Sequence, residues 1–135
     1  MKKITRHQMR ENVFILSFEQ IFQKESCDEV LALADACGEP IVTEQVEEMF
    51  RGIEAHLSEI DAEIEKHLKN WTMDRLSKVS LAILRLGVYE VFHCDDVDND
   101  IVVSECVKLA TTFAFEDDVA FVNGILGSIV RGIKE

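Results

Sequence analysis

The sequence contains little of what most other fold classes need. Six glycines and one proline in 135 residues are too few for a β-sandwich, a collagen-like chain or a disordered chain. No uninterrupted apolar run approaches the roughly 18 residues that a bilayer-spanning helix requires. Basic residues are outnumbered, with 14 Lys+Arg against 26 Asp+Glu and a net charge of −12. This balance excludes a protein that coats nucleic acid over its whole surface, because phosphate binding needs clustered cations.

The sequence also lacks the features of an exported protein. Its basic start runs directly into polar residues, with no apolar segment and no small-residue cleavage site, so we predict no signal peptide. The cysteines include no C-x-x-C pair and are expected to be reduced and mostly buried thiols: Cys27, Cys37, Cys94 and Cys106. We therefore expect a cytoplasmic protein.

Apolar residues recur at helical spacing through most of the chain. Helices are predicted over 13–22, 27–36, 43–70, 79–92 and 101–113, and from 117 or 118 onward. Gly38 is expected to end the second helix and Thr43 to cap the third, in which a bend near Gly52 or Ser58 would be compatible with the pattern. Segment 79–92 is apolar around its whole circumference, which is typical of the central helix of a bundle. We expect an all-α fold of six to seven helices, with close helix packing at Gly124 and Gly127.

No motif predicts catalysis or a cofactor. The glycine-rich phosphate loops are absent, and no Ser or Cys lies in a nucleophile-elbow context. Glu90 and His93 form one Glu-x-x-His pair, whereas a di-iron bundle needs two such pairs and two more inward glutamates. Two further pairs, on the outer face of the predicted long helix, do not complete such a site: His56 with Glu59, and Glu63 with His67. We therefore expect neither an enzyme nor a metal site.

The charge is unevenly distributed. The first ten residues carry four cations and no acid, which leaves 10 basic and 26 acidic groups in the other 125 residues. Arg6 and Arg10 are four residues apart, so on a helix they would share a face and could bridge successive phosphates. An acidic body also favours association with a basic protein. Two alternatives remain open, namely that the basic start is incidental and that the acidity serves only solubility.

Three motifs resemble the NusB family of bacterial transcription antitermination factors. They are W-T-M-D-R-L-S-K-V-S-L-A-I-L-R-L-G-V-Y-E at 71–90, F-V-N-G-I-L at 121–126 and R-H-Q-M-R-E at 6–11. The resemblance implies one NusB-like domain of two small helical bundles, roughly residues 1–70 and 71–135. It also implies binding of the boxA element of ribosomal RNA leader transcripts together with NusE, a basic ribosomal small-subunit protein. The pair would act on the transcription elongation complex and help RNA polymerase pass terminators during ribosomal RNA synthesis.

Carried over by position, the resemblance implies two groups of site residues. Partner contacts are expected at Ser80 and Asp117. RNA contacts are expected at the basic start and at two aromatic residues that could stack on a base if they are exposed, or lie in the core if they are not: Lys2, Lys3, Arg6, His7, Arg10, Phe18 and Phe121.

The sequence departs from the family pattern at several positions, and most of these changes remove a basic residue. His7 and Gln8 replace common arginines, Ala120 replaces a usual lysine, and Ser80 replaces an acidic residue expected at the NusE interface. RNA affinity is therefore expected to be weaker than is typical, or more dependent on the protein partner. The alternative is a helical protein-interaction module of the same fold with weak or no RNA binding. The resemblance also leaves open a homodimer, whereas an RNA-positioning domain like that of some ribosomal RNA methyltransferases fits poorly because these residues include no catalytic domain.

Overall fold

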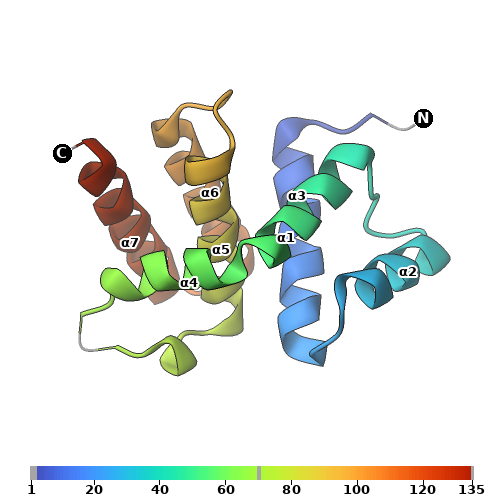
Figure 1. The fold of residues 1–135 in the computed structure, drawn as a ribbon, viewed down its shortest axis with the longest axis horizontal. Coiled ribbons are helices and arrows are strands. Elements are labelled where there is room, and N and C mark those ends of the chain that lie inside the picture. The colour runs from blue at the N-terminus through green and yellow to red at the C-terminus, as the bar shows by residue number, and fades with distance from the viewer. Residues whose placement is uncertain (1–2, 70, 135) are drawn as a thin grey trace. The chain divides into compact units, whose positions relative to one another are not determined.

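The computed structural model describes residues 3–69 and 71–134. Over these residues the chain forms seven α-helices, one 3₁₀ helix and no strand (Figure 1). The α-helices are α1 (Arg6–Gln23), α2 (Cys27–Cys37), α3 (Glu44–Ala55), α4 (Leu57–Lys66), α5 (Lys78–His93), α6 (Asn99–Phe113) and α7 (Glu116–Lys134), and the 3₁₀ helix is η1 (Met73–Arg75). The all-α prediction is confirmed. Within the described residues, no helix is both long enough and apolar enough to cross a membrane.

The helix predicted over 43–70 is not continuous: close to Ser58, one of the two positions where the pattern was compatible with a bend, it is interrupted at His56. Its backbone angles of φ −110° and ψ 19° leave the helical region, and its carbonyl then accepts the first hydrogen bond of α4 from the Ile60 N–H at 2.9 Å. The apolar spacing continues across the break, since Ile53 before it and Ile60 after it are both buried. A hydrophobic pattern that keeps its period cannot reveal a turn at a single residue.

The chain forms two compact units, which we call the N-terminal unit (1–55) and the C-terminal unit (56–135). The change from one to the other coincides with the helix break at His56, whereas the sequence placed it near residue 70.

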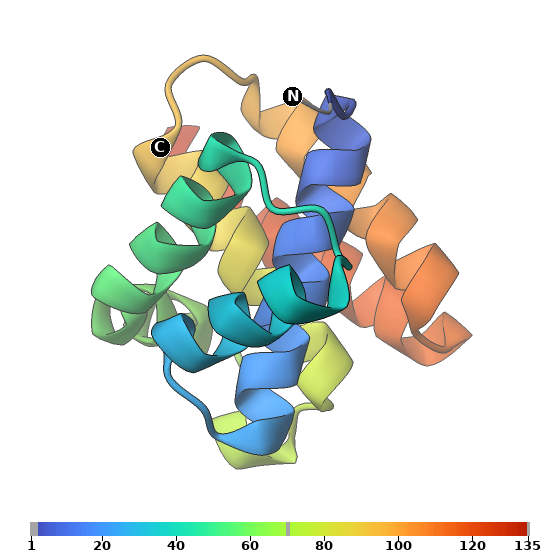
Figure 2. The ribbon, with the colours of Figure 1, turned by 90° about the vertical axis from the view of Figure 1, so that its right-hand side faces the viewer.

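The N-terminal unit consists of α1, α2 and α3, which pack on one another (Figure 2). Thr5 caps α1 in a reciprocal arrangement: the Gln8 N–H donates to Thr5 Oγ1 at 3.1 Å, and the Thr5 N–H donates to Gln8 Oε1 at 2.9 Å. Gly38 ends α2 with φ 77°, a left-handed conformation that glycine adopts without steric penalty. Thr43 Oγ1 accepts the Val46 N–H at 3.2 Å at the start of α3. Both predicted caps are confirmed.

The C-terminal unit is built around α5, which packs against α4, α6 and α7 (Figure 1). The prediction of a central buried helix is confirmed. The helices pack tightly at Gly87 on α5, where a Cβ atom would lie 3.0 Å from both terminal carbons of Leu126 and 3.1 Å from Cys106 Sγ. Close packing was expected at Gly124 and Gly127 instead. A Cβ at Gly124 would have no atom within 4 Å, and at Gly127 it would meet only the flexible side chain of Arg131 at 3.2 Å.

Candidate nucleic-acid interface

The basic start of the chain leads into the first turn of α1. Lys3 precedes the helix, Arg6 is its first residue, and both are exposed, whereas Lys2 lies outside the described residues. The first turn contains no acidic residue, so these cations add to the partial positive charge of the helix N-terminus. His7 is half-buried, and its Nε2 lies 3.4 Å from a carboxylate oxygen of Glu11, with which it pairs when protonated. The exposed cations at this end of α1, within the described residues, are Lys3 and Arg6.

Arg10 does not join this surface, although its spacing from Arg6 predicted that it would. Its relative exposure is 2%. Position 10 lies one helical turn before Val13 and Phe14, which belong to the buried stripe of α1. The expectation that Arg10 contacts phosphate from solvent is therefore corrected.

Phe18 is half-buried within a row of three aromatic rings along α1. Its ring centroid lies 6.1 Å from that of Phe14 and 6.1 Å from that of Phe22, and both pairs are stacked. Phe22, at the outer end of the row, is 56% exposed. The ring of this row that meets solvent most fully is therefore Phe22 and not Phe18.

The C-terminal unit contains a cavity of about 330 Å³ at the start of α5 and α7. It is lined by Trp71, Arg75, Leu76, Ser77, Ser80, Asp117, Asp118 and Phe121. Three residues that the sequence had singled out for binding, Ser80, Asp117 and Phe121, therefore meet at one site. The rings of Trp71 and Phe121 are tilted by 56° with centroids 6.4 Å apart, which leaves aromatic surface on one wall.

Hydrogen bonds around Asp118 define the polar wall of the cavity. Its Oδ1 accepts from the hydroxyl of Ser80 at 3.2 Å and from that of Ser77 at 3.5 Å, and its Oδ2 accepts from the Phe115 N–H at 3.3 Å. Ser80 is 1% exposed, so its hydroxyl holds Asp118 in place and does not itself project toward a partner. Asp117, the next residue, is exposed at the edge of the cavity.

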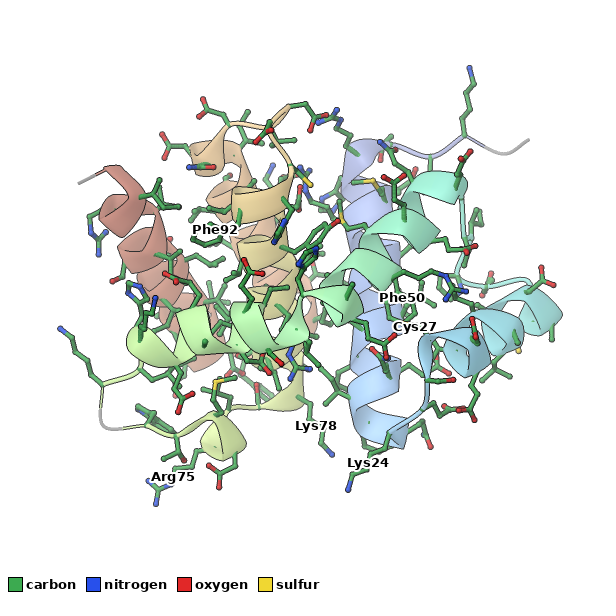
Figure 3. The ribbon with its side chains drawn as sticks, in the orientation of Figure 1. Lys24, Cys27, Phe50, Arg75, Lys78 and Phe92 are labelled. Atoms are coloured by element: carbon green, nitrogen blue, oxygen red, sulfur yellow. The ribbon has the colours of Figure 1, made fainter. Side chains whose placement is uncertain are left out.

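Sequence reasoning did not assign a role to Trp71, Arg75 or Asp118. Trp71 is 52% exposed, and the side chain of Arg75 projects outward from η1 (Figure 3). A signal was present, because the only tryptophan of the chain lies in a polar stretch between two predicted helices, where an apolar core is not expected. Trp71 contributes an exposed ring to the lining of the cavity.

Not every exposed cation of the chain is available to a ligand. Arg51 on α3 donates from Nη2 to Asp28 Oδ1 at 2.7 Å and from Nε to Glu47 Oε2 at 3.0 Å. The hydrogen bond with Asp28, followed by that with Glu47, raises the pKa of Arg51 above its ordinary value. This arginine is already engaged by two carboxylates.

Comparisons with known proteins give matches along almost the whole chain. The model of the NusB family matches residues 4–131. The transcription antitermination protein NusB of Clostridium novyi is 33% identical over 132 residues, which cover 95% of this chain and 99% of the relative. The solved structure of T. maritima NusB superposes with a TM-score of 0.84 at 30% identity, covering 96% of this chain and 93% of that chain.

A further solved structure is described as the antitermination factors NusB and NusE in complex with dsRNA. It superposes with a TM-score of 0.82 at 28% identity, covering 94% of this chain and 96% of that chain. The resemblance found in the motifs at 71–90 and 121–126 is therefore confirmed along almost the whole chain. This chain belongs to the NusB family.

Proposed function

We propose that this chain is an RNA-binding transcription antitermination factor that holds a boxA-like segment of ribosomal RNA leader together with NusE. It acts in the cytoplasm on the transcription elongation complex, and its role is binding and not catalysis. Support comes from the solved complex of NusB and NusE with dsRNA, because that structure resembles this chain over 94% of its length.

The observation that carries the proposal is the aromatic cavity of the C-terminal unit. Trp71 and Phe121 offer ring surface for stacking on an unpaired base, and Arg75 adds a cation at the same site. Trp71 and Phe121 are also the first residues of two of the three sequence motifs that carry the family resemblance. Single-stranded RNA is the ligand that such a combination suits, because its bases are free to leave the stack.

The exposed cations at the start of α1 supply contacts to phosphate. With Arg10 buried, the described part of this segment offers Lys3 and Arg6. Two phosphate contacts to single-stranded RNA correspond to a slope of about −1.4 in log K against log salt, which is a modest electrostatic contribution. We therefore propose that binding depends strongly on the protein partner.

The acidic character of the chain suits a basic partner such as NusE. The net charge of −12 would steer a cationic protein toward this chain and speed their encounter. Asp117 is an exposed carboxylate at the edge of the cavity, where it could pair with a basic side chain of NusE. The protein partner and a stacked base of the RNA would then bind at neighbouring parts of the cavity in the C-terminal unit.

The test is a gel shift of boxA-type RNA with and without purified NusE, with a scrambled RNA of equal length as control. We expect a weak shift with the chain alone, a stronger one with NusE, and neither with the scrambled RNA. Absence of any specific shift in the presence of NusE would overturn RNA binding.

A second candidate is a protein-interaction module that does not bind RNA, which the burial of Arg10 favours. Capture of NusE without a boxA shift at any salt concentration would select it. Sedimentation at two protein concentrations would show whether the chain without its partner forms a homodimer.

A further inference from the structure

Three side chains with metal-binding donor atoms converge in the C-terminal unit, apart from the residues assigned to RNA and NusE. They are His56, Glu59 and His93, whose ligand atoms all lie within 4.8 Å of one another. The Glu59 carboxylate lies beside both imidazoles: Oε2 is 3.4 Å from His56 Nδ1, and Oε1 is 3.9 Å from His93 Nε2. Within the described ranges this is the one group of three such residues.

The break between α3 and α4 creates this arrangement. His56 occupies the capping position of α4 but makes no side-chain capping bond, and Glu59 follows one turn later. His93 is the last residue of α5, the helix against which α4 packs. A continuous helix over 43–70 would have left His56 and Glu59 on an outer face, which is why the sequence predicted no metal site here.

Ring stacking holds the two imidazoles in place. Their centroids are 4.1 Å apart with planes inclined by 25°, and the ring of Tyr89 lies 5.1 Å from that of His93. Tyr89 also lies 6.3 Å from the ring of His56. The orientation of the histidines is therefore set before any ligand binds, which lowers the entropy lost on binding.

We propose that His56, Glu59 and His93 bind a divalent transition metal ion, and that Zn²⁺ fits best. Two imidazole nitrogens and one carboxylate oxygen are zinc ligands, whereas Mg²⁺ and Ca²⁺ prefer oxygen alone. Zinc–nitrogen bonds of about 2.0–2.1 Å in a tetrahedron place neighbouring donors roughly 3.3 Å apart. The 3.4 Å between His56 Nδ1 and Glu59 Oε2 is already close to that value. The three ligand atoms lie within 4.8 Å of one another, so small side-chain rotations would bring them to the zinc geometry.

A zinc ion at this site would have a fourth coordination position without a protein ligand, and it would stabilise the C-terminal unit. Three protein ligands leave one coordination place for water, as in sites that exchange ligands. Because the ligands come from the start of α4 and the end of α5, the ion would join these two helices and stabilise the C-terminal unit by mass action.

Other histidine–glutamate pairs of the chain lack a feature of this cluster. His67 Nδ1 is within 2.7 Å of Ser128 Oγ, so one of its nitrogens is already engaged, and the carboxylate of Glu63 lies 3.5 Å from its Nε2. Within the described residues these two do not belong to a group of three metal-binding side chains. His7 and Glu11 form a two-residue pair at 3.4 Å with the same i, i+4 spacing. His7 therefore provides a matched control that has a similar pair geometry and, within the described residues, belongs to no group of three metal-binding side chains.

The experiment is calorimetric titration of the full-length chain with Zn²⁺ under reducing conditions, together with thermal unfolding with and without the ion. We expect one ion per chain and a higher Tm. Glu59→Gln and His93→Gln should each weaken binding by about tenfold or more and remove the rise in Tm. Circular dichroism of each variant confirms that it is folded, and Glu59, which is exposed, tolerates the change.

Control variants separate this site from other zinc-binding groups. His7→Gln should leave zinc binding unchanged, as should Cys37→Ser and Cys94→Ser, which test whether a thiolate is responsible. The proposal is overturned if the wild-type chain binds no stoichiometric zinc, if binding survives in both Glu59→Gln and His93→Gln, or if Cys94→Ser alone abolishes it.

Discussion

Arg85 on α5 and Asp61 on α4 form a two-point ion pair inside the C-terminal unit. Arg85 Nε donates to Asp61 Oδ1 and Nη2 donates to Oδ2, both at 2.9 Å. The side chains are 16% and 28% exposed, so water screens the pair less than it does a surface pair. The planar guanidinium group of Arg85 makes both hydrogen bonds at the same time, and the pair links α4 to the central helix α5.

We predict that this pair contributes measurably to stability. A double-mutant cycle with Arg85→Lys and Asp61→Asn, followed by urea unfolding, should give a coupling free energy of about 1–2 kcal/mol. The exposed Lys66–Glu63 pair at 3.2 Å is the control and should give less than about 0.5 kcal/mol. Equal coupling in the two cycles would show that the bidentate geometry adds nothing.

Gly87 should not tolerate a methyl group. Gly87→Ala places a Cβ within 3.0 Å of the buried Leu126 side chain, and the resulting overpacking should lower the free energy of unfolding by about 1–3 kcal/mol. Gly124→Ala, on exposed α7 surface with no atom within 4 Å, should raise it by up to about 1 kcal/mol through helix propensity. Chemical denaturation measures both, and a stabilised Gly87→Ala variant would contradict the observed packing.

The two exposed N-terminal cations should determine the salt dependence of RNA binding. Lys3→Ala with Arg6→Ala should weaken boxA binding and reduce the slope of log K against log salt by about 1.4. Lys66→Ala removes a cation that is paired with Glu63 on α4 and should leave that slope unchanged. Fluorescence anisotropy at several salt concentrations gives the slopes, and an unaltered slope in the double variant would remove these residues from the interface.

The aromatic wall of the cavity should matter for RNA independently of charge. Phe121→Ala and Trp71→Ala should each weaken binding by about 1–3 kcal/mol, the range for loss of one base-stacking surface, with little change in the salt slope. Phe115 is 83% exposed but does not line the cavity, so Phe115→Ala should bind normally. If Phe115→Ala lost as much affinity as Phe121→Ala, the effect would not be specific to the cavity.

Cys27 should give stability a distinct dependence on alkaline pH. Burial, followed by the hydrogen bond with Glu54, raises the pKa of the Cys27 thiol to about 12 from 9.0. Between these values the folded chain keeps a proton that the unfolded chain releases, so the contribution is complete below pH 9 and is lost as the pH rises through about 12.

Urea unfolding at a series of pH values tests this difference. Wild-type stability should fall more steeply above pH 9 than that of Cys27→Ala. At neutral pH an alkylating reagent should modify the exposed Cys37 and leave the buried Cys27 untouched until the chain unfolds. Parallel pH profiles for wild type and variant would contradict the assignment.

Local patterns were sufficient to predict most of the fold. The helical spacing of apolar residues located the long helices. Segment 79–92, which is apolar on all sides, was identified as the central helix because a helix surrounded by others is buried on all sides. The interruption at His56 was not predictable in this way. It depends on one residue leaving the helix while the apolar period continues on both sides.

The candidate site was predictable only in part. The resemblance singled out Phe121, Asp117 and Ser80, but their meeting at one cavity emerges only from the structure. The burial of Ser80 and Arg10 likewise depends on tertiary packing, which the spacing of residues in the sequence does not show. The cluster at His56 joins residues far apart in the sequence and required the helix break to form. These are properties of packing and not of any single segment.

The reciprocal cap between Thr5 and Gln8 stabilises the start of α1 at a position where an arginine would have added positive charge. An arginine at position 8 would bring another cation to the N-terminal segment, yet arginine has no acceptor atom to return to the Thr5 N–H. The substitution would therefore remove one of the two capping hydrogen bonds and weaken the helix start at which Arg6 lies. With glutamine at position 8, this protein keeps both capping hydrogen bonds at the start of α1 and carries one positive charge fewer there.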